Sequence, residues 1–197
     1  MSAPYISFIV TAWASRRPAA LPVLFACLRA QTVQDWECLV LDSDFYPPHV
    51  KLCCQDDRVI YLPRPLRRIH EHREMYHVSE WGVKRAIGQY LCFASDDSYY
   101  VPWFSERMLA VAERESLDLV LSDLVLGSPQ VHGAINSQPF TGSVDKTNFV
   151  IRRDKMIPFP GKDDPEGWKI ADGQFVEELV RSGARWGKVA QPLVVHN

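Results

Sequence analysis

The side chains best suited to chemistry in this sequence are aspartates that follow predicted buried strands. Asp96 and Asp97 follow the apolar run Tyr90–Ala94 with one residue between, and Asp42 ends the run that begins at Trp36. In open α/β sheets, ligands bind at the carboxyl ends of the strands. Two adjacent carboxylates repel each other unless a cation lies between them or one stays protonated. The pattern favours a divalent cation bridging to a phosphate; the plainer alternative is that one acid caps the next helix and the other is solvated.

A third carboxylate, Asp172, stands at the start of a predicted helix. The apolar residues of that helix share one face, and they are Phe175, Val176, Leu179 and Val180. A carboxylate fixed by local amides and facing a cleft can act as a general base, which contributes roughly 10²- to 10⁴-fold to a rate. By residue type and position alone, a plain helix N-cap is the more common role for such an aspartate.

Basic side chains concentrate in one segment, Pro63 to His77. They are Arg64, Arg67, Arg68, His70, His72, Arg73 and His77. Such a run is usually a solvated loop or helix face. The functional alternative is a cationic rim near a diphosphate.

The elements that must position these groups alternate between strands and helices. Apolar runs predict strands over residues 5–11, 36–42, 57–62, 90–94, 117–123 and 144–152, with short closing strands at 186–189 and 193–195. Helical spacing predicts helices over 18–30, 71–87, 102–115 and 170–180, with a short helix at most over 48–54. The segment 126–141 is expected to be a loop or irregular hairpin. The β-α-β-α-β order predicts a parallel sheet with right-handed crossovers.

Two details of this pattern bear on the site. Gly88 is expected to end the helix that precedes Tyr90. The strand over 144–152 opens with the polar residues Asp145, Lys146, Thr147 and Asn148, which are expected to form a polar edge that could border a site.

Composition narrows the class of protein. The 197 residues suit one domain, 1–197, with a single core. A net charge of −2 argues against a dedicated nucleic-acid binder but leaves room for a small anionic substrate. Five cysteines without metal-site spacing predict free thiols in a reducing cytoplasm. We expect no integral membrane segment; the oligomeric state is not indicated.

Four motifs, in order and at compatible spacing, resemble family 2 glycosyltransferases of the GT-A fold. They are Ser7–Trp13, Cys27–Asp42, Gly88–Pro102 and Lys169–Phe175. The third motif is closest to the variant in the bacterial spore-coat polysaccharide glycosyltransferase, and the fourth is similar to the segment that carries that protein's catalytic acid. The resemblance covers most of the chain and is weak between about Gly127 and Thr141.

The resemblance implies a single Rossmann-like α/β domain: a mostly parallel central sheet flanked by helices, with a small antiparallel C-terminal portion. It implies a hexosyltransferase-type enzyme that uses Mg²⁺ or Mn²⁺ and inverts the sugar. The donor would be a nucleotide sugar, UDP- or dTDP-linked, and the acceptor a hydroxyl of a saccharide or another molecule.

Carried over by motif, the resemblance assigns five residues to the nucleotide. Thr11 and Trp13 would line the base pocket, and Asp42 would accept a hydrogen bond from the base's imide N–H. Arg73 would be the basic residue on the nucleotide, and Asp96 would contact the ribose and the metal shell. Alternatively, Thr11 and Trp13 could pack at the edge of the hydrophobic core, and Asp42 could cap the following turn.

The resemblance also assigns the metal and the base. Asp97 would ligate Mg²⁺ or Mn²⁺ on the diphosphate, and Asp172 would deprotonate the acceptor. A late histidine is a metal ligand in some relatives, which makes His196 a candidate; the alternative is a surface residue near the chain end.

Four positions depart from the family pattern. Ser95 stands where many members carry a further acid, Ser79-Glu80 stands where an Arg-Asn pair is common, and Ala171 replaces a common acid. These departures raise an alternative function: a catalytically degenerate GT-A domain that binds a nucleotide or a partner without turnover. A nucleotidyltransferase ranks last, because the loop after Thr11 lacks the glycines that such enzymes usually show.

Overall fold

One sheet of nine strands organises the part of the chain that the computed structural model describes, which is residues 5–12, 19–42, 56–62, 71–127, 132–164 and 166–197. Its strands are β1 (Ile6–Ala12), β2 (Trp36–Asp42), β3 (Val59–Leu62), β4 (Tyr90–Ser95), β5 (Ser98–Tyr100), β6 (Leu119–Gly127), β7 (His132–Ile135), β8 (Phe149–Arg152) and β9 (Trp186–His196). The helices are α1 (Ala20–Arg29), α3 (Glu71–Val83), α4 (Phe104–Arg114) and α5 (Ala171–Arg181). Short 3-10 turns are η1 (Lys146–Asn148), η2 (Arg153–Lys155) and η3 (Gly167–Ile170).

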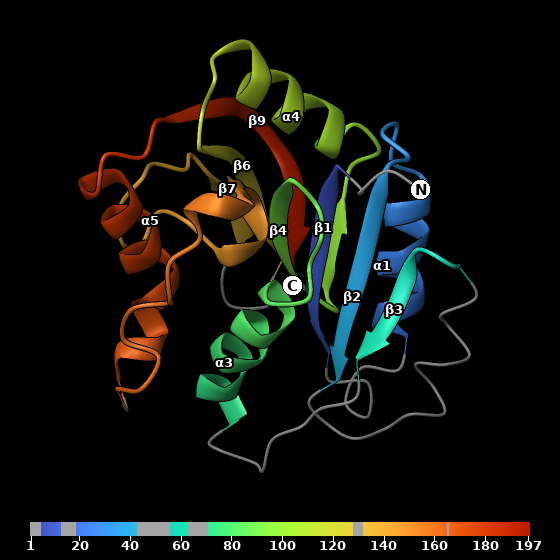
Figure 1. Cartoon of the computed structure of the whole chain (residues 1–197), viewed down its shortest axis with the longest axis horizontal. Helices are drawn as coiled ribbons and strands as arrows, with labels where there is room; N and C mark the ends of the chain where they lie inside the picture. Colours follow the sequence, from blue (N-terminus) through green and yellow to red (C-terminus); the bar gives the residue numbers. More distant parts are fainter. Residues whose placement is uncertain (1–4, 13–18, 43–55, 63–70, 128–131, 165) are drawn as a thin grey trace.

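The sheet has a parallel half and a mixed half. Its order is β3-β2-β1-β4-β8-β6-β9-β5, with β7 paired to β6. Strands β3, β2, β1 and β4 are parallel, β8 runs antiparallel to both β4 and β6, and β9 returns parallel to β6. Figure 1 shows β9 as a long curved strand arching past α4. The predicted α/β fold, a sheet flanked by helices with an antiparallel C-terminal portion, is confirmed.

Both faces of the sheet are covered by helices, and the side chains of the strands alternate between them. Along β1, Phe8 and Val10 pack into a core with α1 and α4, whereas Ile9 packs into a second core with α3 and α5. Because both faces are buried, the central strands read as continuous apolar runs. Helices thus pack against both faces of the strands whose ends carry the candidate site.

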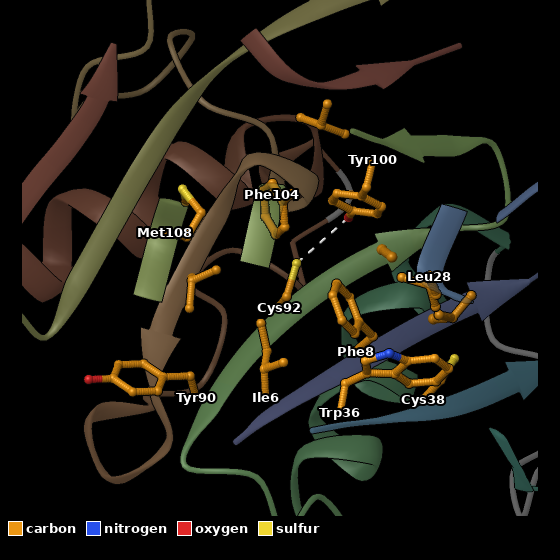
Figure 2. Close-up of a cluster of buried hydrophobic side chains, with 14 of the residues drawn as sticks. Ile6, Phe8, Leu28, Trp36, Cys38, Tyr90, Cys92, Tyr100, Phe104 and Met108 are labelled. Atoms are coloured by element: carbon orange, nitrogen blue, oxygen red, sulfur yellow. Dashed lines mark hydrogen bonds between the residues drawn. The ribbon is translucent and has the colours of Figure 1, made fainter. Parts of the chain in front are cut away.

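Figure 2 shows the core on the α1 and α4 face, where Phe8, Tyr100 and Phe104 meet between β1, β5 and α4. The Phe8 and Tyr100 rings lie 5.7 Å apart, edge to face, and the Tyr100 and Phe104 rings lie 4.6 Å apart. The Tyr100 hydroxyl also donates to the Phe93 carbonyl at 3.2 Å. Tyr100 thus fixes the short strand β5 onto the end of β4.

Several predicted elements differ from the observed ones at the C-terminal half. Residues 144–148 are not strand, because Asp145 caps a 3-10 turn there and only Phe149–Arg152 pairs with the sheet. The two predicted closing strands are one strand, β9, in which Pro192 stands where the pairing with β6 shifts register. Proline is tolerated at such an irregularity because no ladder hydrogen bond is required there. The segment Ser98–Tyr100, for which no strand was predicted, is a strand because it pairs with the end of β9.

Other predictions have mixed outcomes. The segment 126–141 contains a hairpin, since β7 pairs with the end of β6. The short helix over 48–54 lies outside the described residues. The three described cysteines, Cys27, Cys38 and Cys92, are free thiols as predicted. Within the described ranges, the helices are too short or too polar for any of them to traverse a bilayer.

Gly88 has a different role from the predicted helix stop. Helix α3 already ends at Val83, and Gly88 lies against β1 so closely that an added Cβ would stand 2.7 Å from the Ser7 amide nitrogen and 2.9 Å from the Ile6 carbonyl carbon. The buried Glu37 carboxylate accepts the Ile87 amide at 2.7 Å and the Gly88 amide at 3.3 Å. Glycine is therefore required for close approach of the two backbones.

We predict that Gly88→Ala lowers the free energy of unfolding by about 1–3 kcal/mol, the usual cost of overpacking a filled site. Chemical denaturation of wild type and variant measures this difference. Gly133→Ala in β7 is the matched control, because an added Cβ there meets nothing within 4 Å. Equal losses in the two variants would contradict the close-approach explanation.

Candidate functional site

A cavity of about 190 Å³ opens where β1 and β4 end. It is lined by Thr11, Met75, Ser95, Asp96, Asp97, Asp145, Lys146, Asp172, His196 and Asn197. The paired acids and the third carboxylate, predicted from distant parts of the sequence, thus border the same cavity. Thr11 and His196 join them.

The paired acids occupy the tight turn between β4 and β5. The Asp96 amide donates to the Thr11 carbonyl at 3.2 Å, which ties the turn to the end of β1. The Ser95 amide donates to the Ser98 hydroxyl at 3.1 Å and closes the turn from within. Asp96 and Asp97 are only 1% and 4% exposed. Buried carboxylates of this kind need compensating positive charge or hydrogen bonds.

His196 reaches the paired acids because β5 pairs with the end of β9, with Ser98 opposite His196. Its Nε2 lies 3.6 Å from Oδ1 of Asp97, and its Nδ1 lies 3.1 Å from Oδ2 of Asp145. Burial acts to lower the pKa of His196, but the hydrogen bond and negative charge of Asp145, together with Asp97, raise it above 6.5. The imidazole therefore stands between two carboxylates.

Asp145 is fixed by the turn that it caps. Its Oδ1 accepts the Thr147 amide at 2.9 Å, while Asn148 Oδ1 accepts the Asp145 amide at 3.1 Å. Asn148 in turn donates to the Ser122 carbonyl at 2.6 Å, which anchors η1 on β6. Burial acts to raise the pKa of Asp145, but His196 and the turn amide lower it to about 2.

Asp172 lies in the first turn of α5 and is held from the side of η1. Its Oδ2 accepts the backbone N–H of Lys146 at 3.1 Å. Burial and the nearby charge of Asp145 raise the pKa of Asp172 to about 6, against the opposing effects of Lys146 and a hydrogen bond with Tyr76. A carboxyl group that titrates near neutrality suits general-base chemistry.

Lys146 is the cation of the cavity and is only 2% exposed. Its Nζ donates to Thr11 Oγ1 at 2.8 Å and to Met75 Sδ at 3.5 Å. Burial lowers the pKa of Lys146, and the surrounding carboxylates of the cavity oppose that shift. The sequence predicted a polar edge that could border a site here, but placed it in a strand. The pattern Asp145-x-x-Asn148 carries a capping signal that could have indicated the turn.

Three other predicted site residues remain predictions. Trp13 lies outside the described residues. For Asp42 and Arg73 the structure describes only the backbone, at the end of β2 and in the first turns of α3.

The departures at Ser79-Glu80 have structural roles. The Ser79 hydroxyl donates to the Met75 carbonyl at 2.7 Å within α3. Glu80 accepts the Phe159 amide at 2.8 Å and pairs with Lys162 at 3.1 Å, which ties the segment before α5 to α3. Neither residue lines the cavity.

The described part of the chain offers no complete set of side-chain ligands for a metal ion. Among the residues that the structure describes, no group of three or more His, Cys, Asp or Glu side chains is arranged to hold one. Any cation at Asp97 and His196 would need further ligands from substrate or solvent.

The sheet and its flanking helices define a glycosyltransferase-like α/β fold. Solved structures of the glycosyltransferase TarS from S. aureus share it. TarS 1–349 superposes with a TM-score of 0.75 at 14% identity, over 98% of this chain and 60% of that one. The complex of TarS 1–349 with UDP has a TM-score of 0.74 at 14% identity, over 97% of this chain and 60% of that one. The complex with UDP-GlcNAc has a TM-score of 0.69 at 13% identity, over 97% of this chain and 58% of that one.

The chain spans less than two thirds of the TarS chains, and at this identity the likeness shows the fold alone. It supports the predicted glycosyltransferase fold and gives no support to the closer resemblance to the spore-coat enzyme. No protein-family model matches the sequence. No curated protein matches it either.

Gly173 holds the segment before η1 close to Asp172. An added Cβ at Gly173 would collide with Thr141 Cα and stand 3.0 Å from the Thr141 amide nitrogen. Inside a helix, alanine normally stabilises by about 1 kcal/mol relative to glycine. We predict that Gly173→Ala instead destabilises the protein by about 1–3 kcal/mol, because backbone atoms must move. Urea denaturation measures whether the free energy of unfolding falls or rises in the variant. A rise would contradict this packing.

Proposed function

We propose that the protein is a metal-dependent, inverting glycosyltransferase that moves a sugar from a nucleotide-sugar donor, UDP- or dTDP-linked, to an acceptor hydroxyl. The observation that carries the proposal is the shared cavity: the buried acids Asp96 and Asp97 and the poised acid Asp172 border it together, in a glycosyltransferase-like fold. The structures of TarS with UDP and UDP-GlcNAc support a uridine-linked donor.

The nucleotide would bind at the edge where the parallel strands end. Thr11 and Asp42 both lie at that edge, since β1 and β2 are paired so that Ala12 stands opposite Asp42. Sheet topology places ligands there. In the proposal Thr11, Trp13 and Asp42 contact the base. Arg73 is the basic residue on the nucleotide, and Asp96 contacts the ribose and the metal shell.

Asp97 and His196 are the proposed protein ligands of Mg²⁺ or Mn²⁺. Their facing atoms, Oδ1 and Nε2, are 3.6 Å apart, close enough to share one ion with modest adjustment. Asp145 on the other imidazole nitrogen matches the carboxylate that commonly orients a metal-bound histidine. Mg²⁺ typically takes one or two carboxylates plus substrate phosphates and water. When bound, the cation neutralises charge on the leaving diphosphate.

Asp172 is the proposed base. Its carboxylate would accept the proton of the acceptor hydroxyl while the hydroxyl oxygen forms a bond to the anomeric carbon. The bond from that carbon to the diphosphate oxygen breaks, and the electron pair leaves with the diphosphate. A single displacement of this kind inverts the anomeric configuration.

Transfer activity tests the proposal. Purified protein is incubated with Mn²⁺, a panel of nucleotide sugars and a panel of saccharide acceptors, and the released nucleoside diphosphate is measured. We expect Asp172→Asn to reduce transfer by roughly 10²- to 10⁴-fold, the usual contribution of a positioned base. Asp57→Asn, at an exposed position, is the matched control and should leave transfer unchanged.

Other outcomes would overturn parts of the proposal. Full activity in Asp172→Asn would remove that residue as the base. Metal-dependent UDP binding without transfer or slow donor hydrolysis would favour the degenerate nucleotide-binding domain instead.

The pH profile should report the environment of Asp172. Because its pKa is raised from 3.8 to about 6, the carboxylate is protonated, and so unable to accept a proton, below that pH. We predict that kcat/KM falls as pH drops through about 6, whereas an ordinary aspartate would hold activity to about 4. Rates measured from pH 4.5 to 8, with the fold followed by circular dichroism, test this. A constant rate down to pH 5 would contradict it.

Metal binding should depend on His196 and on its carboxylate partner. We predict that His196→Gln and Asp145→Asn each weaken Mn²⁺ affinity in the presence of UDP by about 10- to 100-fold. Electron paramagnetic resonance of free Mn²⁺ gives the dissociation constant without any turnover. His77→Gln is the matched control, since His77 pairs with Asp163 outside the cavity. Unchanged affinity in both variants would show that the metal ligands are misassigned.

A further inference from the structure

Lys146 is a buried cation that the proposed chemistry has not yet used. In the described part of the chain its ammonium forms no ion pair; its hydrogen bonds go to two uncharged groups, the Thr11 hydroxyl and the Met75 sulfur. An ammonium carries three donors. One donor thus remains for a ligand inside the cavity that Lys146 lines.

Lys146 contacts residues on both sides of the proposed reaction site. Its backbone N–H is bonded to Asp172, whereas its Nζ is bonded to Thr11 at the end of β1. The side chain therefore crosses from the acceptor side to the nucleotide side of the cavity. The bond that breaks in a transfer from a nucleotide sugar must lie between these two sides.

The charge of the cavity also calls for a second cationic group. Its lining includes four aspartates, Asp96, Asp97, Asp145 and Asp172, and a diphosphate brings further negative charge. His196 is directed toward Asp97 and Asp145 through its two ring nitrogens, so neither nitrogen is left for a diphosphate. Among the described lining residues, Lys146 is the only lysine or arginine.

We infer that the Lys146 ammonium binds the diphosphate of the nucleotide-sugar donor and stabilises it as the leaving group. This rests on the proposed function. As the anomeric carbon–oxygen bond breaks, the diphosphate oxygen takes the electron pair and the ammonium donates a hydrogen bond to the phosphate. Lys146 keeps its proton throughout. Lys146 therefore binds a phosphate group and also offsets the negative charge of the four aspartates.

Binding measurements separate this role from a purely structural one. Isothermal titration compares UDP, pyrophosphate and uridine on wild type, Lys146→Met and Lys146→Arg, each with EDTA and with Mn²⁺. We expect Lys146→Met to weaken UDP and pyrophosphate affinity by about 10- to 100-fold, the size of a lost charge-assisted hydrogen bond, and to change uridine affinity by less than about twofold. Lys146→Arg should recover part of the loss, because it keeps the charge.

Lys188→Met is the matched control. Lys188 is also shielded, with a side chain 14% exposed, and pairs with Asp123 at 2.6 Å outside the cavity. Its substitution should leave UDP affinity unchanged. If Lys146→Met lowers the melting temperature but leaves the ratio of UDP to uridine affinity as in wild type, Lys146 is a structural counter-charge and the inference fails.

A second measurement follows Lys146 in the wild-type protein, so it does not require Lys146→Met to fold. In wild type labelled with ¹³C-lysine, the Lys146 ε-methylene signal, assigned by its loss in Lys146→Arg, should shift on addition of pyrophosphate. An unmoved signal while pyrophosphate binds would overturn the inference alone. If wild type binds neither UDP nor pyrophosphate, the proposed function fails and the inference fails with it.

Discussion

The placement of two adjacent carboxylates at the end of a buried strand is the constraint on which the rest of this structure depends. Asp96 and Asp97 are almost fully buried, and buried charges are costly unless other groups compensate them. The surrounding elements supply that compensation from several directions. Strand β9 brings His196 to Asp97, and the η1 turn brings Lys146 into the same cavity.

The η1 turn links the two halves of the candidate site. Asp145 caps the turn and faces His196. The backbone N–H of the next residue, Lys146, donates to the carboxylate of Asp172. The groups proposed for metal binding and for proton transfer therefore share one rigid support. Its own anchor is Asn148, which is fully buried and bonded to β6.

Electrostatics gives similar side chains different properties in this cavity. The pKa of Asp145 is lowered to about 2 beside His196, whereas that of Asp172 is raised to about 6 by burial and by the charge of Asp145. Two carboxyl groups whose pKa values are driven apart are suited to different tasks. The departures at Ser79-Glu80 leave this arrangement intact, because those side chains support α3 and the segment before α5.

The sequence by itself determined the parallel half of the fold and its edge of acids. Apolar runs and turn residues are local signals, so β1, β2 and β4 and the acids that follow them could be predicted from spacing. Only the tertiary structure decided that Asp145 and Lys146 belong to the site, that residues 186–196 form one strand, and that β5 pairs with it. Antiparallel pairing with β5 and a register shift at Pro192 set the position of His196, and such long-range register leaves no local pattern to read.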